Sequence, residues 1–219
     1  MAKFLVEEEV GYDPQHIGFP NLGGCMALVL LTDQGLYGFH ITPGNARKAP
    51  VFLQFIQNTG PGGTMKRLYG SCYFLNRYAG KVNGLDSLGQ WKGEMKNIAN
   101  ALGFHGKVTG YDLSTWNSHS DKTMKDVLGN KTHKGVNYLE YVKDPSGQKC
   151  RIFYKKMEKM QLTPGVFAAT DPIRKIMGSN LANPVKNTIT SSADIVTTTG
   201  NKGKLHEVGF FGRHSFDIP

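Results

Sequence analysis

The segment at residues 25–31 constrains the fold most, because all of its residues are apolar. A run of this length without a polar residue is typical of a β-strand whose two faces are both buried. Residues 33–35 (Asp-Gln-Gly) then have the composition of a tight turn. Residues 36–42 have the aromatic and β-branched content of a returning strand. The sequence therefore predicts a buried β-hairpin over 25–42.

Two helices are predicted after this hairpin. The first spans 45–58, where an apolar stripe recurs at helical spacing and Pro50 lies in the first turn, where a missing N–H costs little. The second begins after a capping residue, Asp86 or Ser87, and ends at Gly103, a natural C-terminal stop. The apolar stripe of the second helix consists of Leu88, Trp91, Met95, Ile98, Ala99 and Leu102.

Strands alternate with these helices along the chain. Residues 11–21 carry two prolines and are expected to form a loop, Gly70 is a candidate β-bulge, and 114–134 is expected to be a polar excursion. An Asp-Pro-Ser-Gly sequence at 144–147 predicts a hairpin turn. The strands are expected at 3–10, 65–78, 107–113, 136–142 and 149–154.

This order of elements predicts an α/β (α+β) sandwich with mixed, largely antiparallel sheets and two main helices. The domain that contains them is expected to cover residues 1–160. Apolar periodicity weakens beyond that point, and Thr, Ser, Asn and Gly dominate. Residues 161–219 are therefore predicted to be a C-terminal extension that packs on the core or is partly mobile.

The chain has 219 residues and a formal net charge of +9, which bears on its partners. A positive balance suits nucleic acid, an anionic membrane surface or an acidic protein. The basic residues are scattered, however, and the densest groups are two pairs, Arg47-Lys48 and Lys155-Lys156. Nucleic acid is therefore disfavoured as a partner, and a solvated basic surface is the simpler interpretation.

The N-terminus and the cysteines suggest the cellular compartment. The chain turns acidic at Glu7, too early for the apolar core of a signal peptide, and no apolar run is long enough for a membrane span. The three cysteines, Cys25, Cys72 and Cys150, form neither a disulfide framework nor a zinc pattern. We therefore expect synthesis in the cytoplasm with reduced thiols, although export without a signal peptide would leave no trace here.

A candidate nucleophile lies at the start of the predicted hairpin. Gly23 and Gly24 allow a sharp turn directly before Cys25, so that nearby backbone N–H groups can serve as an oxyanion hole. Pairing about the 33–35 turn brings His40, on the returning strand, close to Cys25. An adjacent imidazole converts a thiol to the nucleophilic thiolate. The alternative is that Cys25 is only a small core residue and His40 a structural one.

The sequence around these two residues resembles a known family. Residues 22–33 read Leu-Gly-Gly-Cys-Met-Ala-Leu-Val-Leu-Leu-Thr-Asp, and residues 38–43 read Gly-Phe-His-Ile-Thr-Pro. This pattern resembles the signature of the bacterial chemoreceptor glutamine deamidases (CheD), whose Cys–His chemistry also occurs in the cytotoxic necrotizing factors and in Burkholderia lethal factor. The resemblance is strongest over 21–43. It implies a CheD-like sandwich and hydrolysis of a protein glutamine to glutamate.

The resemblance assigns the nucleophile to Cys25 and the base to His40, with backbone N–H groups of Gly24 and Cys25 as oxyanion donors. The hairpin turn is shorter than in the chemotaxis enzymes. Where those enzymes have a threonine that orients the histidine, this chain has Phe19, whose side chain cannot do so. Asn21 or the backbone carbonyl of Phe19 is therefore expected to orient His40, as a main-chain carbonyl does in the necrotizing factors.

The implied enzyme requires no cofactor and no metal, and its partner is a protein substrate with an exposed glutamine. The basic charge and the extension favour a bacterial toxin or effector over a chemotaxis enzyme, with an immunity or delivery partner as a further expectation. Three alternatives remain. The same dyad could catalyse proteolysis or transglutamination, the fold could serve as a non-enzymatic protein-binding module, or the protein could bind nucleic acid.

The other polar candidates are expected to have structural or surface roles. The acidic run at 7–9 is expected to be solvated, and His16 to lie near the site or on the plain surface. The glycine-rich segment 58–64 lacks the Gly-Lys-Ser/Thr ending of a phosphate loop and is expected to be a loop at the rim of the site. Cys72 and Cys150 are expected to be inert. Metal-ligand spacing is not seen among the remaining histidines, His105, His119, His133, His206 and His214.

Overall fold

The computed structural model describes residues 3–20, 22–78, 80, 82–114, 136–157, 173–182, 206–210 and 212–219. The elements up to residue 111 are β1 (Lys3–Phe4), β2 (Glu9–Asp13), β3 (His16–Phe19), β4 (Met26–Thr32), β5 (Leu36–Ile41), the 3-10 turn η1 (Ala46–Lys48), α1 (Ala49–Asn58), β6 (Met65–Cys72), α2 (Phe74–Arg77), α3 (Ser87–Leu102) and β7 (Gly106–Tyr111). The later elements are β8 (Val136–Lys143), β9 (Cys150–Met157), β10 (Ile173–Met177), β11 (Asn180–Leu181), β12 (His206–Glu207) and β13 (Arg213–Ile218).

The strands form two sheets. The larger has eight strands in the order β11-β10-β2-β5-β4-β6-β7-β13, and the smaller has five in the order β1-β3-β8-β9-β12. Most neighbouring strands are antiparallel, while β1 pairs with β3 and β6 with β7 in parallel. The protein is thus a mixed α/β structure with mostly antiparallel sheets and few helices, as the sequence predicts.

The predicted hairpin lies at the centre of the larger sheet. Its strands β4 and β5 pair with Met26 opposite Ile41 and Ala27 opposite His40. Every residue of both strands is buried, because each face of the sheet is covered by another layer. The hairpin prediction is therefore confirmed, including the turn at 33–35.

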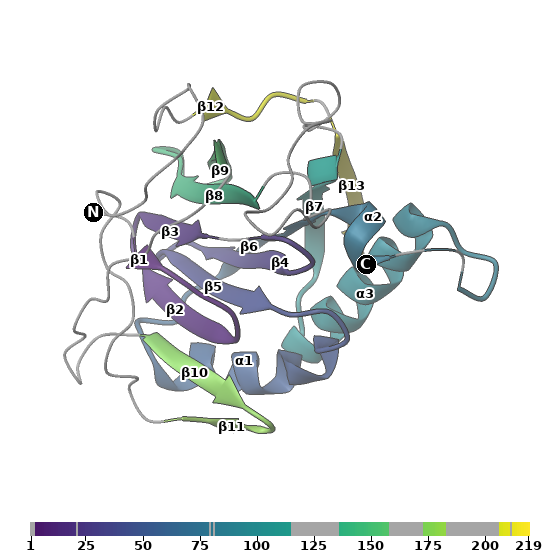
Figure 1. Cartoon of the computed structure of the whole chain (residues 1–219). Coiled ribbons are helices and arrows are strands. Elements are labelled where there is room, and N and C mark those ends of the chain that lie inside the picture. Colours follow the sequence, from purple (N-terminus) through teal and green to yellow (C-terminus); the bar gives the residue numbers. More distant parts are fainter. Residues whose placement is uncertain are drawn as a thin grey trace.

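The two faces of the hairpin contact different layers (Figure 1). Every second side chain of β4, starting with Met26, packs against α1 and α3, where the contacting residues include Phe52 and Trp91. The intervening side chains, including Ala27, pack against the smaller sheet, through residues such as Tyr141. The layers are therefore helices, eight-stranded sheet and five-stranded sheet.

The second helix begins and ends as the sequence predicts, whereas the first, predicted over 45–58, starts as the 3-10 turn η1 and becomes α-helical only at Ala49. Pro50 lies at the start of α1, where its missing N–H has no helical partner to lose. Asp86 caps α3 by accepting a hydrogen bond from the backbone N–H of Gly89 at 2.7 Å. Gly103 ends α3 in the left-handed conformation, with φ of 63°, which glycine adopts without steric cost.

Three predicted segments differ from the structure. The strand predicted over 3–10 is interrupted, since β1 ends at Phe4 and β2 begins at Glu9. Residues 11–21 are not a loop, because β2 and β3 occupy most of them; Pro14 lies between these strands and Pro20 directly after the second, where neither removes a ladder N–H. The predicted strand over 65–78 ends at Cys72, and the helix α2 follows. Gly70 is not the bulge either, since the register shift falls between Leu31 and Thr32.

The described parts of 161–219 add strands to both sheets. β10 pairs with β2 at one edge of the larger sheet, and β13 pairs with β7 at the other. β12 pairs with β9 in the smaller sheet. The polar excursion predicted at 114–134 lies almost wholly outside the described residues.

Candidate active site

Cys25 and His40 lie on the same face of the central hairpin. Ala27 is directly opposite His40, and Cys25 is two residues before Ala27 on a strand whose side chains alternate. Cys25 is therefore the diagonal cross-strand neighbour of His40, a relation that separates Cα atoms by about 7–8 Å. Both side chains face the smaller sheet. The sequence prediction that the turn brings these residues together is consistent with this register.

His40 is completely buried, and within the described part of the chain one of its two ring nitrogens is hydrogen-bonded. Nδ1 lies 2.8 Å from the backbone carbonyl oxygen of Leu5. A carbonyl only accepts, so Nδ1 carries the proton and Nε2 of the neutral ring presents a lone pair. Nε2 is buried without a hydrogen-bond partner among the described residues. Burial lowers the pKa of His40, which keeps the ring neutral and Nε2 available as a proton acceptor.

The group that orients His40 differs from the expected one. The carbonyl at Nδ1 belongs to Leu5, on the segment between β1 and β2, rather than to Phe19. Phe19 instead directs its ring edge toward the imidazole, with ring centroids 6.0 Å apart. Asn21 lies outside the described residues. A main-chain carbonyl does hold the histidine, but it comes from a part of the chain that the motif does not include.

Cys25 is held as a thiol. Its side chain is buried, with 4% of the residue exposed, and Sγ donates a hydrogen bond to Oε1 of Glu7 at 3.6 Å. Burial, followed by the negative charge of Glu7, raises the pKa of Cys25 to about 12. The resting site is therefore a thiol near a neutral imidazole, and not the thiolate that the sequence analysis expects, because Glu7 and burial both oppose ionisation.

The same charged groups act on both members of the pair. Glu7 and Glu8 raise the pKa of Cys25 and of His40, and Arg77 lowers both. These effects are smaller than that of burial in each case. The two side chains thus share one electrostatic environment, with two carboxylates and one guanidinium around them.

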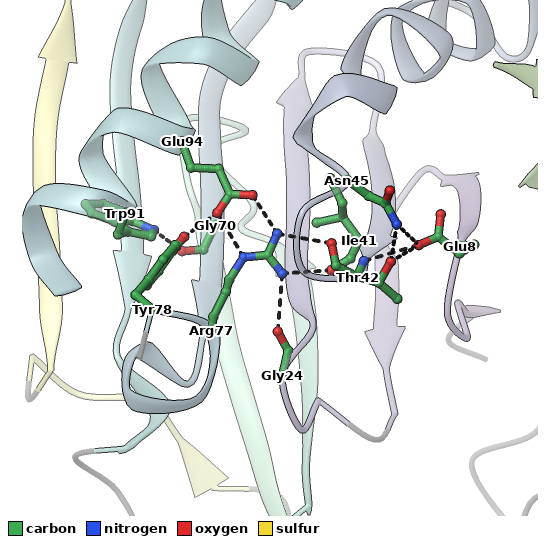
Figure 2. Close-up of polar contacts among 10 residues, drawn as sticks. All are labelled: Glu8, Gly24, Ile41, Thr42, Asn45, Gly70, Arg77, Tyr78, Trp91 and Glu94. Atoms are coloured by element: carbon green, nitrogen blue, oxygen red, sulfur yellow. Dashed lines mark hydrogen bonds and ion pairs between the residues drawn. The ribbon is translucent and has the colours of Figure 1, made fainter. Parts of the chain in front are cut away.

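Arg77, at the end of α2, fixes the backbone on both sides of the dyad. Its guanidinium forms a two-pronged pair with Glu94 of α3, at 2.6 and 2.8 Å. It also donates to the carbonyls of Gly24, at 3.2 Å, and of Ile41 and Thr42, at 3.1 and 3.3 Å. Figure 2 shows the guanidinium between α3 and the end of the hairpin.

The contact with Gly24 bears on the predicted oxyanion donors. The peptide between Gly24 and Cys25 is planar and trans, so its N–H points opposite to its carbonyl. Arg77 holds that carbonyl and thereby fixes the direction of the Cys25 N–H. The oxyanion role of Gly24 and Cys25 remains a prediction, and Arg77 supplies the rigidity that such a role requires.

The acidic run at 7–9 is not a solvated stretch, contrary to the sequence expectation. Residues 6–9 form a tight turn, which we call the acidic turn, closed by a hydrogen bond from the Glu9 N–H to the Val6 carbonyl at 3.0 Å. The Glu9 side chain returns to the Val6 N–H at 3.0 Å and is buried. Only Glu7 of the three acids is exposed, and it points toward Cys25.

Glu8 clamps the acidic turn to the segment after the hairpin. Its carboxylate accepts hydrogen bonds from the Thr42 hydroxyl, from Asn45 Nδ2 at 3.0 Å and from Lys48 Nζ. Figure 2 shows the contacts with Thr42 and Asn45. The backbone of Glu8 has a φ of 65°, a region that non-glycine residues rarely adopt. The clamp therefore holds a conformation that the chain does not prefer by itself.

The glycine-rich segment 58–64 does not border the site. Its Thr64 N–H donates to the Asp33 side chain at 2.9 Å, and its Gly62 N–H to the Tyr37 hydroxyl at 2.8 Å. These partners belong to the turn end of the hairpin, whereas Cys25 lies at the opposite end. At about 3.3 Å per residue, the length of β4 separates this loop from Cys25 by roughly 20 Å. The expectation of a rim loop is therefore wrong.

The remaining polar candidates have structural partners. His16 Nδ1 lies 2.9 Å from Glu140, which also accepts from the Tyr138 hydroxyl at 2.8 Å. Burial raises the pKa of Cys72 and raises that of Cys150 to about 12. These two cysteines are thus protonated, as expected for inert thiols.

Sequence reasoning missed the residues that surround the dyad. Leu5, Glu8 and Arg77 all contact it or fix its backbone, yet each comes from an element remote from the hairpin. Nothing in the local sequence pattern of these residues indicates the contact. The left-handed backbone of Glu8 marks it as unusual, but this feature appears in the structure and not in the sequence.

The described residues contain no group of three or more His, Cys, Asp and Glu side chains placed to hold a metal ion. Of the histidines considered for zinc, His119 and His133 lie outside these residues. None of the helices in the described part of the chain is long and apolar enough to cross a membrane. No protein-family model matches the sequence, and none of the curated proteins searched matches it.

Proposed function

We propose that this protein is a cysteine hydrolase that deamidates a glutamine side chain of a target protein, with Cys25 as nucleophile and His40 as base. The observation that carries the proposal is the state of His40. A buried polar atom without a partner costs free energy, and among the residues that the structure describes Nε2 of His40 is such an atom. His40 lies on the face of the hairpin that also carries Cys25, as its diagonal cross-strand neighbour, so a proton acceptor is available on the nucleophile's side of the sheet.

The reaction would proceed in two stages. In the first, Nε2 of His40 takes the proton from Sγ while Sγ attacks the carboxamide carbon. The resulting oxyanion is held by backbone N–H groups at Gly24 and Cys25. His40 returns the proton to the departing nitrogen. The C–N bond then breaks, ammonia leaves, and the acyl group remains on Cys25 as a thioester. In the second stage, His40 deprotonates water, which hydrolyses the thioester to the glutamate carboxylate and restores the thiol.

The proposal extends to a CheD-like fold family and to the setting in which such enzymes act. A bacterial toxin or effector, with a protein substrate and a separate immunity or delivery partner, agrees with the basic surface charge. The partners themselves follow from the resemblance at 21–43 and not from any contact described above.

The test is a proteome-wide assay in water enriched in heavy oxygen. Hydrolysis of a glutamine carboxamide incorporates one solvent oxygen into the new glutamate, which peptide mass spectrometry detects. We expect labelled glutamates with the native protein and none with Cys25→Ala or His40→Ala. Added primary amine would be incorporated instead if the enzyme is a transglutaminase, and new peptide termini would identify a protease.

A second candidate is a non-enzymatic protein-binding module, and one observation favours it. Burial raises the pKa of Cys25 to about 12, the same range as that of Cys150. Equal iodoacetamide labelling of Cys25 at every pH in the native protein and in His40→Ala, together with no labelled glutamate, would support this module and remove the hydrolase.

A further inference from the structure

Glu7 is the exposed group that touches the candidate nucleophile. Its Oε1 lies 3.6 Å from Sγ of Cys25, while the residue itself is exposed to solvent. Cys25 and His40 are both buried. A substrate group that approaches Sγ from solvent therefore comes within reach of the Glu7 carboxylate.

The position of Glu7 is fixed by its neighbours on both sides. Glu9 closes the acidic turn through both its backbone N–H and its carboxylate. Glu8 ties the turn to Thr42, Asn45 and Lys48. The backbone of Glu7 is therefore held between these two anchors, at the position from which its side chain reaches the thiol.

The chemistry of the two groups at the site is complementary to a primary carboxamide. An ionised carboxylate only accepts hydrogen bonds, and the NH2 of a carboxamide only donates them. A hydrogen bond to a charged group is about twice as strong as a neutral one. His40 provides the second, independent sign of a ligand, since its Nε2 is buried and unpartnered among the described residues on this same face.

We infer that Glu7 is a substrate-recognition residue, whose carboxylate accepts a hydrogen bond from the NH2 of the substrate carboxamide. The site would then select unsubstituted side-chain amides over esters and over peptide bonds, which have no NH2. The inference rests on the proposed function and names the chemical class of its substrate.

The same contact adds to the burial that keeps Cys25 a thiol in the resting site. Without substrate, the S–H of Cys25 is the donor to Glu7. When the carboxamide NH2 replaces it, the thiol proton is released from Glu7 and can pass to Nε2 of His40. The S–C bond then forms as the proton moves, so that charge on sulfur develops only when a carboxamide is present.

The experiment compares two neutral reagents that alkylate Cys25 in the full-length protein. Iodoacetamide carries an NH2, and its N,N-dimethyl derivative does not. The ratio of their rates at Cys25, divided by the ratio for glutathione, cancels the ionisation of the thiol. We expect this normalised ratio to exceed one in the native protein and to fall by about tenfold in Glu7→Ala.

Two variants control for charge and for folding. Asp217→Ala removes another exposed carboxylate, on β13 at the far edge of the larger sheet, and should leave the ratio unchanged. Glu7→Gln keeps the shape and an acceptor oxygen, and should give an intermediate ratio. Equal ratios in the native protein and Glu7→Ala would overturn the inference, as would the failure of both reagents to reach Cys25 until the protein is unfolded.

The two proposals can fail separately. If labelled glutamates require Cys25 and His40 but the normalised ratio of alkylation rates does not depend on Glu7, the hydrolase proposal stands and the recognition role of Glu7 is wrong. If that ratio depends on Glu7 but no labelled glutamate is found, the protein has a carboxamide-binding site and the hydrolase proposal is wrong.

Discussion

Two ion pairs flank the candidate site, and they hold different parts of the chain. On one side, Arg77 pairs with Glu94, with 1% and 13% of their side chains exposed. On the other, Lys48 pairs with Glu8, with 12% and 15% exposed. Both pairs are therefore largely removed from water. They differ in what else they bind, since Arg77 holds backbone carbonyls and Glu8 holds side chains.

This difference indicates which side of the site is held rigidly and which side can change conformation. Arg77 fixes the ends of β4 and β5, so its loss would disturb the strands that carry Cys25 and His40. The Glu8 side chain instead fixes the acidic turn, which leads into β2 at Glu9 and whose backbone at Glu8 is separately hydrogen-bonded to His40 and Ile176. Loss of the Glu8 side-chain contacts leaves these backbone hydrogen bonds in place, so we expect the Glu7 side chain to become more mobile while the core stays intact.

The largest effect is expected when the Arg77 side is broken. Arg77→Met would leave the Glu94 carboxylate largely buried without its partner and would free three carbonyls. Removing one partner of a buried pair costs about 3–5 kcal/mol, so we expect a loss of that size in the free energy of unfolding. Denaturant titration followed by circular dichroism measures it.

The matched control is Arg151→Met, because Arg151 forms a similar two-pronged pair with Glu207 on the surface. About half of each of these side chains is exposed, so little change is expected. A loss in Arg77→Met no larger than that in Arg151→Met would show that the buried clamp does not support the fold.

A smaller effect is expected on the Glu8 side. Glu8→Ala removes hydrogen bonds from Lys48, Asn45 and Thr42, but solvent reaches part of the clamp. We expect a loss of about 1–2 kcal/mol in the free energy of unfolding, with faster iodoacetamide labelling of Cys25 in the native state. Unchanged labelling in a destabilised Glu8→Ala protein would mean that the acidic turn does not cover the thiol.

The clamp should also respond to pH. Burial alone would raise the pKa of Glu8, but the hydrogen bonds and charge of Lys48, with the contacts of Thr42 and Asn45, lower the pKa overall below its usual 4.5. A carboxyl with a lower pKa in the folded state stabilises it above the unfolded pKa and loses that contribution as pH falls through the folded value. The stability difference between the native protein and Glu8→Gln should therefore be constant near neutral pH and shrink below about pH 4.5. Denaturant titrations across that range test it, and a difference that grows on acidification would contradict it.

The smallest effect on stability is expected at Glu7, whose side chain has no structural anchor in the clamp. Glu7→Gln should leave the unfolding free energy unchanged but lower the pKa of Cys25, because the Glu7 charge raises that pKa. Each unit of pKa is a tenfold change in thiolate below the pKa, so labelling by the N,N-dimethyl reagent, which offers Glu7 no NH2, should rise by up to about tenfold. A labelling rate against pH that is identical in both proteins would show that Glu7 does not act on the thiol.

The central hairpin and both main helices were accessible to sequence reasoning for a physical reason. An apolar run, a turn sequence and helix caps are local signals, and each acts within a few residues of the structure that it specifies. The same locality explains the failure at 11–21, where two prolines indicate a loop. Each proline lies outside a strand, and only pairing with β5 and β8 reveals that these strands exist.

The sequence by itself determined that Cys25 and His40 share one hairpin, because alternation and a short turn leave little freedom in the register. Only the tertiary structure decided what surrounds them. Leu5 is 35 residues from His40, Arg77 is 53 from Gly24, and Glu7 is 18 from Cys25. Contacts across such separations depend on how layers pack and leave no periodic pattern in the chain. The ionisation of the thiol belongs to this second class, because burial and a neighbouring carboxylate set it.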